Sequence, residues 1–264
     1  AVLVSEIWHM DKVVVGATVV SFGTTLPETA VSVAAAVSGE PGLALGNAVG
    51  SILCNIGLVL GIALLIKPIV LERTAMNRQS LLQLASAVVL VALSLLFQPE
   101  GSRMVDGGRL TQGAGFVMVA LLVVYTWYSV VAARRGKVSQ ATSGARGAAA
   151  TLHNESDPGP DGIPPTWRIL ILLALGTVLV IIGSRGLVFA ASEFALRVGV
   201  PPSVVAATLV AFGTSTPELV TAIAAARRGH GELALGNVLG ANVLNSLFVA
   251  GLSAAVTVGG LVVQ

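Results

Sequence analysis

The sequence has little charge and almost no cysteine, and each shortage excludes a class of protein. Charged residues make up 11% of the 264 residues and hydrophobic residues 55%, a balance that soluble globular domains do not have. The single cysteine, Cys54, excludes an intrachain disulfide. The formal net charge of +2 gives no reason to expect a nucleic acid as a partner. With a mean hydropathy of +0.88, the chain is predicted to be an integral membrane protein.

The apolar residues fall into seven segments that are each long enough to cross a bilayer. A hydrocarbon core of about 30 Å needs roughly 20 residues of α-helix. We expect membrane-spanning helices at residues 13–37, 43–66, 79–98, 113–133, 167–191, 203–226 and 233–262. The predicted fold class is therefore an all-α integral membrane protein that crosses the lipid bilayer several times.

A polar segment separates the fourth predicted span from the fifth. Residues 134–166 are rich in Arg, Gly, Ser, Thr, Asp and Pro, a composition typical of a flexible linker. It divides the chain into a first half, residues 1–133, and a second half, residues 167–264. Most lysine and arginine residues between the spans lie on the same side as this linker. The positive-inside rule therefore predicts a cytoplasmic linker, in a protein of the plasma (inner) membrane.

Two short stretches carry the only acidic residues deep inside predicted spans. Residues 23–28 read GTTLPE and residues 213–218 read GTSTPE, so that Glu28 and Glu218 occupy matching places. A buried, ionised carboxylate costs several kcal/mol or more unless a partner compensates it. The surrounding spans contain no lysine or arginine at those depths. The pair therefore predicts a bound cation.

The two motifs belong to a longer internal repeat. A shift that places Gly23 on Gly213 aligns residues 17–61 with residues 207–251 without a gap. Matching pairs include Ala17 with Ala207, Phe22 with Phe212, Gly46 with Gly236, Asn47 with Asn237, Gly50 with Gly240, Asn55 with Asn245 and Gly61 with Gly251. The copies begin on the first and sixth predicted spans, so they run in opposite directions through the membrane. Inverted repeats are typical of secondary transporters, whose site lies near the midplane between the halves.

The residues around the acids fit a cation that prefers oxygen ligands. Pro27 and Pro217 remove a helix donor and free backbone carbonyls near the threonine and serine residues. A hard divalent ion such as calcium takes about 6 to 8 oxygens. Two carboxylates, freed carbonyls, hydroxyls and water would supply them. The glycines of GNAVG (46–50) and GNVLG (236–240) are spaced for close helix packing.

These motifs together resemble a known family. The glutamate of GTTLPE is followed by Asn47 of GNAVG, and the glutamate of GTSTPE is followed at the same spacing by Asn237 of GNVLG. They look like the two alpha repeats of the sodium/calcium exchanger family, prokaryotic type, in the cation/calcium antiporter superfamily. The resemblance implies an inverted-repeat antiporter fold of ten helices, of which seven are predicted here. On that mapping the first half lacks most of its first helix and the second half lacks its last helices.

The resemblance also implies which residues bind the transported ions. Calcium would be bound by Glu28, Glu218, Thr24 and Thr214, and sodium by Ser21, Thr25, Ser51, Asn55, Ala211, Ser215 and Asn245, several of them through backbone carbonyls. Two positions depart from the family pattern: Ala241 stands where the first repeat has Ser51, and Asn245 where some members have an aspartate. Both change the expected number of monovalent ions.

The predicted function is secondary active antiport of sodium against calcium, by alternating access at the shared two-glutamate site. The chain is not expected to be an enzyme or to carry a cofactor, and its partners would be calcium and sodium ions and the lipid bilayer. A calcium/proton antiporter of the same superfamily would use the same acids. From other classes, a cation channel or an intramembrane hydrolase could also keep two buried acids. The sodium dependence of calcium flux separates the two kinds of antiporter.

Overall fold

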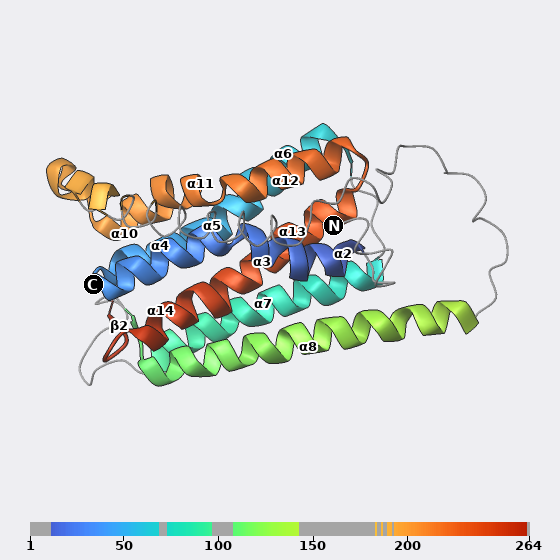
Figure 1. The fold of residues 1–264 in the computed structure, drawn as a ribbon, viewed down its shortest axis with the longest axis horizontal. Coiled ribbons are helices and arrows are strands. Elements are labelled where there is room, and N and C mark those ends of the chain that lie inside the picture. The colour runs from blue at the N-terminus through green and yellow to red at the C-terminus, as the bar shows by residue number, and fades with distance from the viewer. Residues whose placement is uncertain are drawn as a thin grey trace, which may run out of the picture.

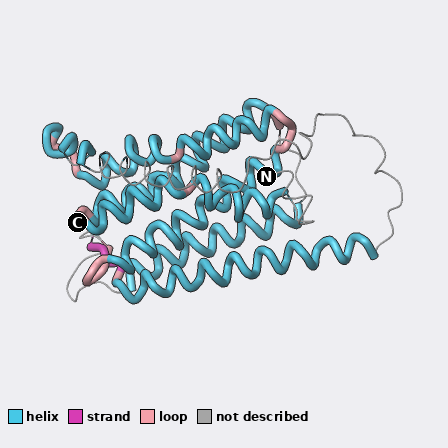
Figure 2. The backbone as a smooth tube through the Cα atoms, in the orientation of Figure 1, coloured by secondary structure: helices cyan, strands magenta, loops and turns pink. Residues whose placement is uncertain are grey.

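The fold consists of long helices packed side by side, as Figures 1 and 2 show. The computed structural model describes residues 12–68, 73–96, 108–142, 183, 186, 189–191 and 193–262. Within these ranges four continuous segments have the length and composition of membrane spans: Pro41–Ile66, Met76–Leu96, Gln112–Val131 and Gly231–Val256. Two further spans are bent, Val13–Thr24 with Leu26–Val37 by 47° and Pro202–Thr214 with Thr216–Arg227 by 43°. The four continuous and two bent spans correspond to six of the seven predicted spans. Nearly all of the fifth predicted span lies outside the described residues.

The first repeat is built from a bent span and a continuous one. Its elements are α2 (Lys12–Val15), the π-helical turn η1 (Gly16–Val20), α3 (Ser21–Thr24), α4 (Leu26–Val37), α5 (Pro41–Cys54), the π-helical turn η2 (Asn55–Val59) and α6 (Leu60–Ile66). The helices α7 (Arg73–Leu96) and α8 (Gln112–Thr142) follow. Helix α8 continues past residue 133, so the first residues of the predicted linker are helical, and the rest of the linker lies outside the described residues.

The second repeat has the same elements, with boundaries at the equivalent positions of the repeat. They are α10 (Pro202–Val205), η4 (Ala206–Val210), α11 (Ala211–Thr214), α12 (Thr216–Arg227), α13 (Gly231–Leu244), η5 (Asn245–Val249) and α14 (Ala250–Val256). Even the turns match, because Gly39 and Gly229 follow α4 and α12 with φ values of 81° and 77°, and such left-handed positions favour glycine. In Figure 1, α2 to α4 and α10 to α12 run in opposite directions, as the inverted repeat predicts.

The last span is shorter than predicted. Helix α14 ends at Val256, and the chain then forms the two-residue strand β2 (Leu261–Val262). It pairs antiparallel with β1 (Arg109–Leu110), with Leu110 opposite Leu261. The helix ends because Thr257 is extended, with φ −94° and ψ 120°. Gly259 and Gly260 then take φ values of 85° and 82°, which no right-handed helix contains. The predicted span reached residue 262 because this segment is hydrophobic. In the structure, the residues after Val256 form a turn and a strand instead.

The glycine pairs bring helices of opposite repeats into backbone contact. A Cβ atom on Gly240 would overlap the Cα and carbonyl of Ala17, and one on Gly236 would overlap the carbonyl of Val13. In the other repeat, a Cβ on Gly50 would overlap the backbone of Ala207. The close packing predicted from the glycine spacing is confirmed. Helix α13 therefore lies against α2 and η1, and α5 lies against η4.

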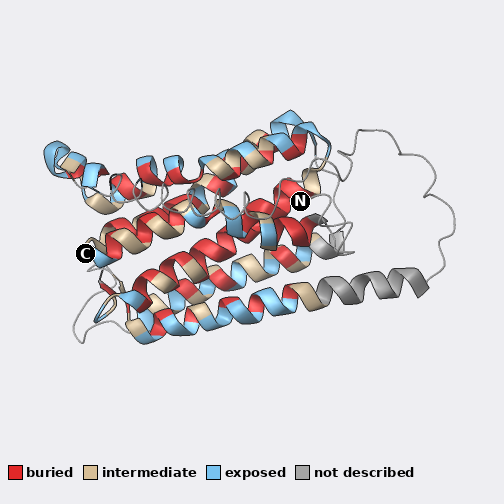
Figure 3. Cartoon of the chain, in the orientation of Figure 1, coloured by how far each residue is buried: buried red, intermediate tan, exposed pale blue. Residues whose placement is uncertain are grey.

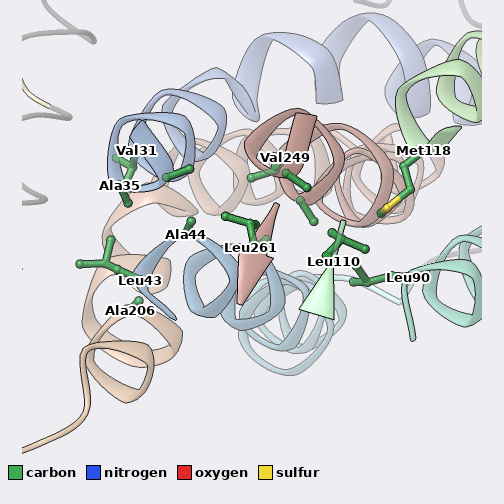
Figure 4. Close-up of a cluster of buried hydrophobic side chains, with 14 of the residues drawn as sticks. Val31, Ala35, Leu43, Ala44, Leu90, Leu110, Met118, Ala206, Val249 and Leu261 are labelled. Atoms are coloured by element: carbon green, nitrogen blue, oxygen red, sulfur yellow. The ribbon is translucent and has the colours of Figure 1, made fainter. Parts of the chain in front are cut away.

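Burial is greatest along the last helix. In the 18-residue apolar stretch of Gly231–Val256, 89% of the residues are buried, compared with 28% in the stretch of the same length in Pro41–Ile66, and the red stretch of α13 and α14 in Figure 3 shows this difference. Helix α8 packs against α14, and α7 packs against α13 and η5. Leu90, Met118 and Val249 belong to one buried hydrophobic cluster, which Figure 4 shows. Large apolar side chains such as Leu65, at 88% exposure, lie on the outer surface, where a bilayer would surround them.

Candidate cation site

Both bent spans break three residues before their glutamate. Helix α3 ends at Thr24 and α4 begins at Leu26, with Thr25 between them at φ −82° and ψ 2°. Ser215 occupies the same place between α11 and α12, at φ −81° and ψ 6°. Pro27 and Pro217 fall in the first turn of the helices that follow, and each lacks the N–H that a continuous helix would use. The breaks therefore set backbone carbonyls free beside the two acids.

The two glutamates are fully buried and accept hydrogen bonds from the opposite repeat. Glu28 and Glu218 are each 0% exposed. Ser215 Oγ donates to Glu28 Oε1 at 3.0 Å, and Thr25 Oγ1 donates to Glu218 Oε1 at 3.2 Å. Each hydroxyl lies at the break of one repeat and contacts the acid of the other. The two halves of the predicted site therefore meet at one interface.

The second oxygen of each carboxylate, Oε2, has no hydrogen-bond partner in the described part of the chain. Both Oε2 atoms are buried, and neither glutamate forms an ion pair with any residue that the structure describes. Uncompensated buried carboxylates cost several kcal/mol each, so this arrangement requires a cation or protons. No group of three or more His, Cys, Asp or Glu side chains occurs in the described ranges. A cation here would complete its shell with hydroxyl, amide and carbonyl oxygens, which suits hard ions.

Two asparagines connect the breaks across the interface. Thr214 Oγ1 donates to Asn47 Oδ1 at 3.1 Å, and Thr24 Oγ1 donates to Asn237 Oδ1 at 3.3 Å. The two asparagines belong to the GNAVG and GNVLG sequences that follow the glutamates, here called the GN motifs. From the sequence alone they helped only to identify the repeat and the family. In the fold they hold the threonines that precede the acids.

The same asparagines are also fixed within their own repeat. Asn47 Nδ2 donates to Ser32 Oγ at 2.9 Å and to the Glu28 carbonyl at 3.3 Å. Asn237 Nδ2 donates to Thr221 Oγ1 at 2.9 Å. Hydrogen bonds to the oxygen and from the NH₂ group therefore fix the orientation of both amides. Buried polar networks hold a single geometry in this way.

The structure buries nearly every residue predicted to bind an ion. Ten of the eleven are buried and Thr24 is half-buried; the ten are Ser21, Thr25, Glu28, Ser51, Asn55, Ala211, Thr214, Ser215, Glu218 and Asn245. Several carry polar atoms with no partner in the described ranges, namely Ser51 Oγ, Asn55 Oδ1 and both amide atoms of Asn245. Such orphaned groups need an explanation, and a bound cation would account for the three orphaned oxygens, since an oxygen can bind a cation and an NH₂ group cannot.

Two other predicted ligands form hydrogen bonds with residues that are near them in the sequence. Ser21 Oγ donates to the Thr18 carbonyl at 3.4 Å, and the Ala211 carbonyl accepts from Thr214 Oγ1 at 3.3 Å. Ala241, at the place of Ser51, is 0% exposed and contributes no hydroxyl. Asn242, a fully buried amide next to it, was not predicted, because the first repeat has Ile52 at that position.

Comparison with known proteins decides the family. The family model described as "Sodium/calcium exchanger protein" matches residues 1–149 and 168–263. The chain belongs to the sodium/calcium exchanger family. Members of this family are transporters, so the chain is a cation/calcium antiporter of the membrane and not an enzyme. This confirms the resemblance that the two motifs indicated, and it excludes the intramembrane hydrolase.

Relatives match most of the chain. Sodium/calcium exchanger MaX1 of Methanosarcina acetivorans is 32% identical over 261 residues, which cover 92% of this chain and 73% of the relative. Inner membrane protein YrbG of Escherichia coli is 32% identical over 259 residues, covering 98% and 74%. A solved structure of the sodium-calcium exchanger NCX_Mj, soaked with Na⁺ and Sr²⁺, matches with a TM-score of 0.65 at 28% identity, covering 99% of this chain and 76% of that one. The all-α, inverted-repeat membrane fold is thereby confirmed.

Proposed function

We propose that the protein exchanges sodium for calcium by alternating access at one site shared between the two repeats. The observation that carries the proposal is a pair of buried Oε2 atoms, one on Glu28 and one on Glu218, at equivalent places in opposite repeats. Neither atom has a hydrogen-bond partner among the residues that the structure places. A divalent cation between them would compensate both charges. The carbonyls and hydroxyls of Thr24 and Thr214 would add neutral oxygens.

Sodium competes for the same carboxylates, with additional ligands on either side. In the first repeat these are Ser21, Thr25, Ser51 and Asn55, and in the second they are Ala211, Ser215 and Asn245. The absence of a hydroxyl at Ala241 leaves the second repeat with one ligand fewer than the first. Either calcium or sodium therefore fills the site, and the sodium gradient drives calcium out of the cytoplasm.

Coupling follows from the cost of an empty site. Two ionised carboxylates without a cation would have to pass through an occluded state in which nothing compensates them. The loaded site moves more readily because the ion cancels their charge. The two halves, residues 1–133 and 167–264, would rock against each other around the site, joined by a cytoplasmic linker in a plasma (inner) membrane protein.

The test is calcium flux in vesicles that contain the purified protein. We expect calcium uptake when sodium is loaded inside and diluted outside, and no uptake when choline replaces sodium. Glu28→Gln and Glu218→Gln each remove one charge with little change in shape, and each is expected to abolish exchange. Calcium uptake driven by a pH gradient, and indifferent to sodium, would instead identify a calcium/proton antiporter. Retained exchange in either variant would remove that glutamate from the site.

A further inference from the structure

The two π-helical turns η2 and η5 begin with an asparagine at the same repeat position. Asn55 opens η2 and Asn245 opens η5, and both are 0% exposed. An amide has one oxygen that can bind a cation and one NH₂ group that repels it. At such a position the orientation of the amide decides whether the side chain attracts or opposes an ion.

In the first repeat this orientation is fixed by a residue of the other repeat. Asn55 Nδ2 donates to Asn242 Oδ1 at 3.1 Å. The NH₂ group is thereby held in one direction, while Asn55 Oδ1 is buried and has no partner within the described residues. Ser246 Oγ donates to the backbone carbonyl of Asn242 at 3.0 Å, which helps to fix that part of α13.

In the part of the chain that the structure describes, the second repeat has no equivalent contact. The position equivalent to Asn242 is Ile52, a half-buried apolar residue with no hydrogen-bonding group in its side chain. Accordingly, neither amide atom of Asn245 has a hydrogen-bond partner among the residues that the structure describes. The two asparagines are equal in repeat position and burial, but only Asn55 has a directed amide.

We propose that Asn242 is a positioning residue that holds the amide of Asn55 so that its oxygen faces sodium. This inference rests on the proposed function, in which Asn55 is a sodium ligand. Its consequence is that the sodium position of the first repeat is preorganised, whereas Asn245 must orient its amide when an ion arrives. Preorganised ligands bind more tightly because less ordering is required at the moment of binding. The two repeats therefore bind sodium unequally.

The experiment separates sodium affinity from calcium affinity. Asn242→Ile gives the second repeat the side chain that the first repeat has at Ile52. In vesicles, the sodium concentration for half-maximal calcium efflux is measured together with calcium–calcium exchange in sodium-free buffer. We expect Asn242→Ile to raise the sodium value roughly three- to tenfold, the effect of one lost hydrogen bond, and to leave half-saturation by calcium near that of the unaltered protein. Asn242→Asp, which keeps an oxygen acceptor, should not raise it.

A double variant tests whether the effect acts through Asn55. Once Asn55→Ala has removed the amide, adding Asn242→Ile should change the sodium dependence no further. Additive effects, an equal shift for both ions, or no shift at all would each overturn the inference while sodium-driven exchange itself stands. If Asn242→Ile does not fold, the near-isosteric Asn242→Leu is measured instead, with the same expected rise in the sodium value. A raised sodium value in Asn242→Asp would also contradict the inference. Calcium flux indifferent to sodium in the unaltered protein would instead contradict the proposed function.

Discussion

The backbone contact at Gly240 gives a prediction about stability, and another glycine of the chain provides the control variant. A Cβ atom at Gly240 would overlap the backbone of Ala17, which cannot rotate away as a side chain could. At Gly61, also in a membrane helix, an added Cβ would meet nothing within 4 Å. Both Gly→Ala changes gain up to about 1 kcal/mol of helix propensity. Only Gly240→Ala also incurs overpacking, typically about 1–3 kcal/mol and more against backbone.

We therefore expect the two variants to shift thermal stability in opposite directions. Gly61→Ala should melt at or slightly above the temperature of the unaltered protein. For Gly240→Ala the overpacking exceeds the gain in propensity by about 1–2 kcal/mol. It should therefore melt lower by roughly 2–8 °C, since each kcal/mol moves the midpoint of a chain of this size by about 2–4 °C. The assay is the fraction of purified protein that remains monodisperse after heating in detergent.

The same variant should also affect transport, because α13 carries Asn237 one turn before Gly240. Moving α13 away from η1 would lengthen the hydrogen bond from Thr24 to Asn237, which is 3.3 Å in this structure. Reconstituted Gly240→Ala should therefore exchange calcium more slowly than Gly61→Ala. Equal melting temperatures for the two variants, or a higher one for Gly240→Ala, would refute the reasoning that backbone contact sets this interface.

Two further changes test the asparagine connections and the departure from repeat symmetry. Asn47→Leu removes the acceptor of Thr214 Oγ1 and the donor to Ser32; we expect a several-fold rise in the calcium concentration for half-maximal exchange, and unchanged calcium affinity would show that the connection does not shape the site. Ala241→Ser restores the hydroxyl that Ser51 supplies in the first repeat; we expect half-maximal exchange at lower sodium with little change for calcium, and a rise in the sodium value would contradict the added-ligand argument.

Much of this fold was predictable because the sequence repeats itself. The alignment of Glu28 with Glu218 in the repeat predicted two equivalent acids facing each other, and the structure contains matching breaks at Thr25 and Ser215. Glycine spacing predicted close helix contacts, which Gly240 makes. Apolar runs located the spans well, because the length that a bilayer requires is a strong constraint.

Partner choice across the interface could not be predicted. A motif shows which hydroxyls and amides are present, but only the packed helices decide that Ser215 donates to Glu28 rather than to its own Glu218. The end of the last helix was missed for a related reason. Composition does not distinguish an apolar strand such as Leu261–Val262 from an apolar helix, and the positive φ of Gly260 appears only once the chain is folded.

The crossed hydrogen bonds bear directly on how the proposed site would operate. If each repeat satisfied its own acid, the two halves could separate without disturbing either carboxylate. Here Thr25 and Ser215 each donate a hydrogen bond to the acid of the other repeat. The asparagines of the two GN motifs likewise accept a hydrogen bond from a threonine of the other repeat, Thr214 or Thr24. Any sliding of one half against the other must stretch these contacts and expose two carboxylates together. On the proposed mechanism, an ion that bridges the acids replaces the attraction that such a movement loses, so binding and rocking become a single coupled event.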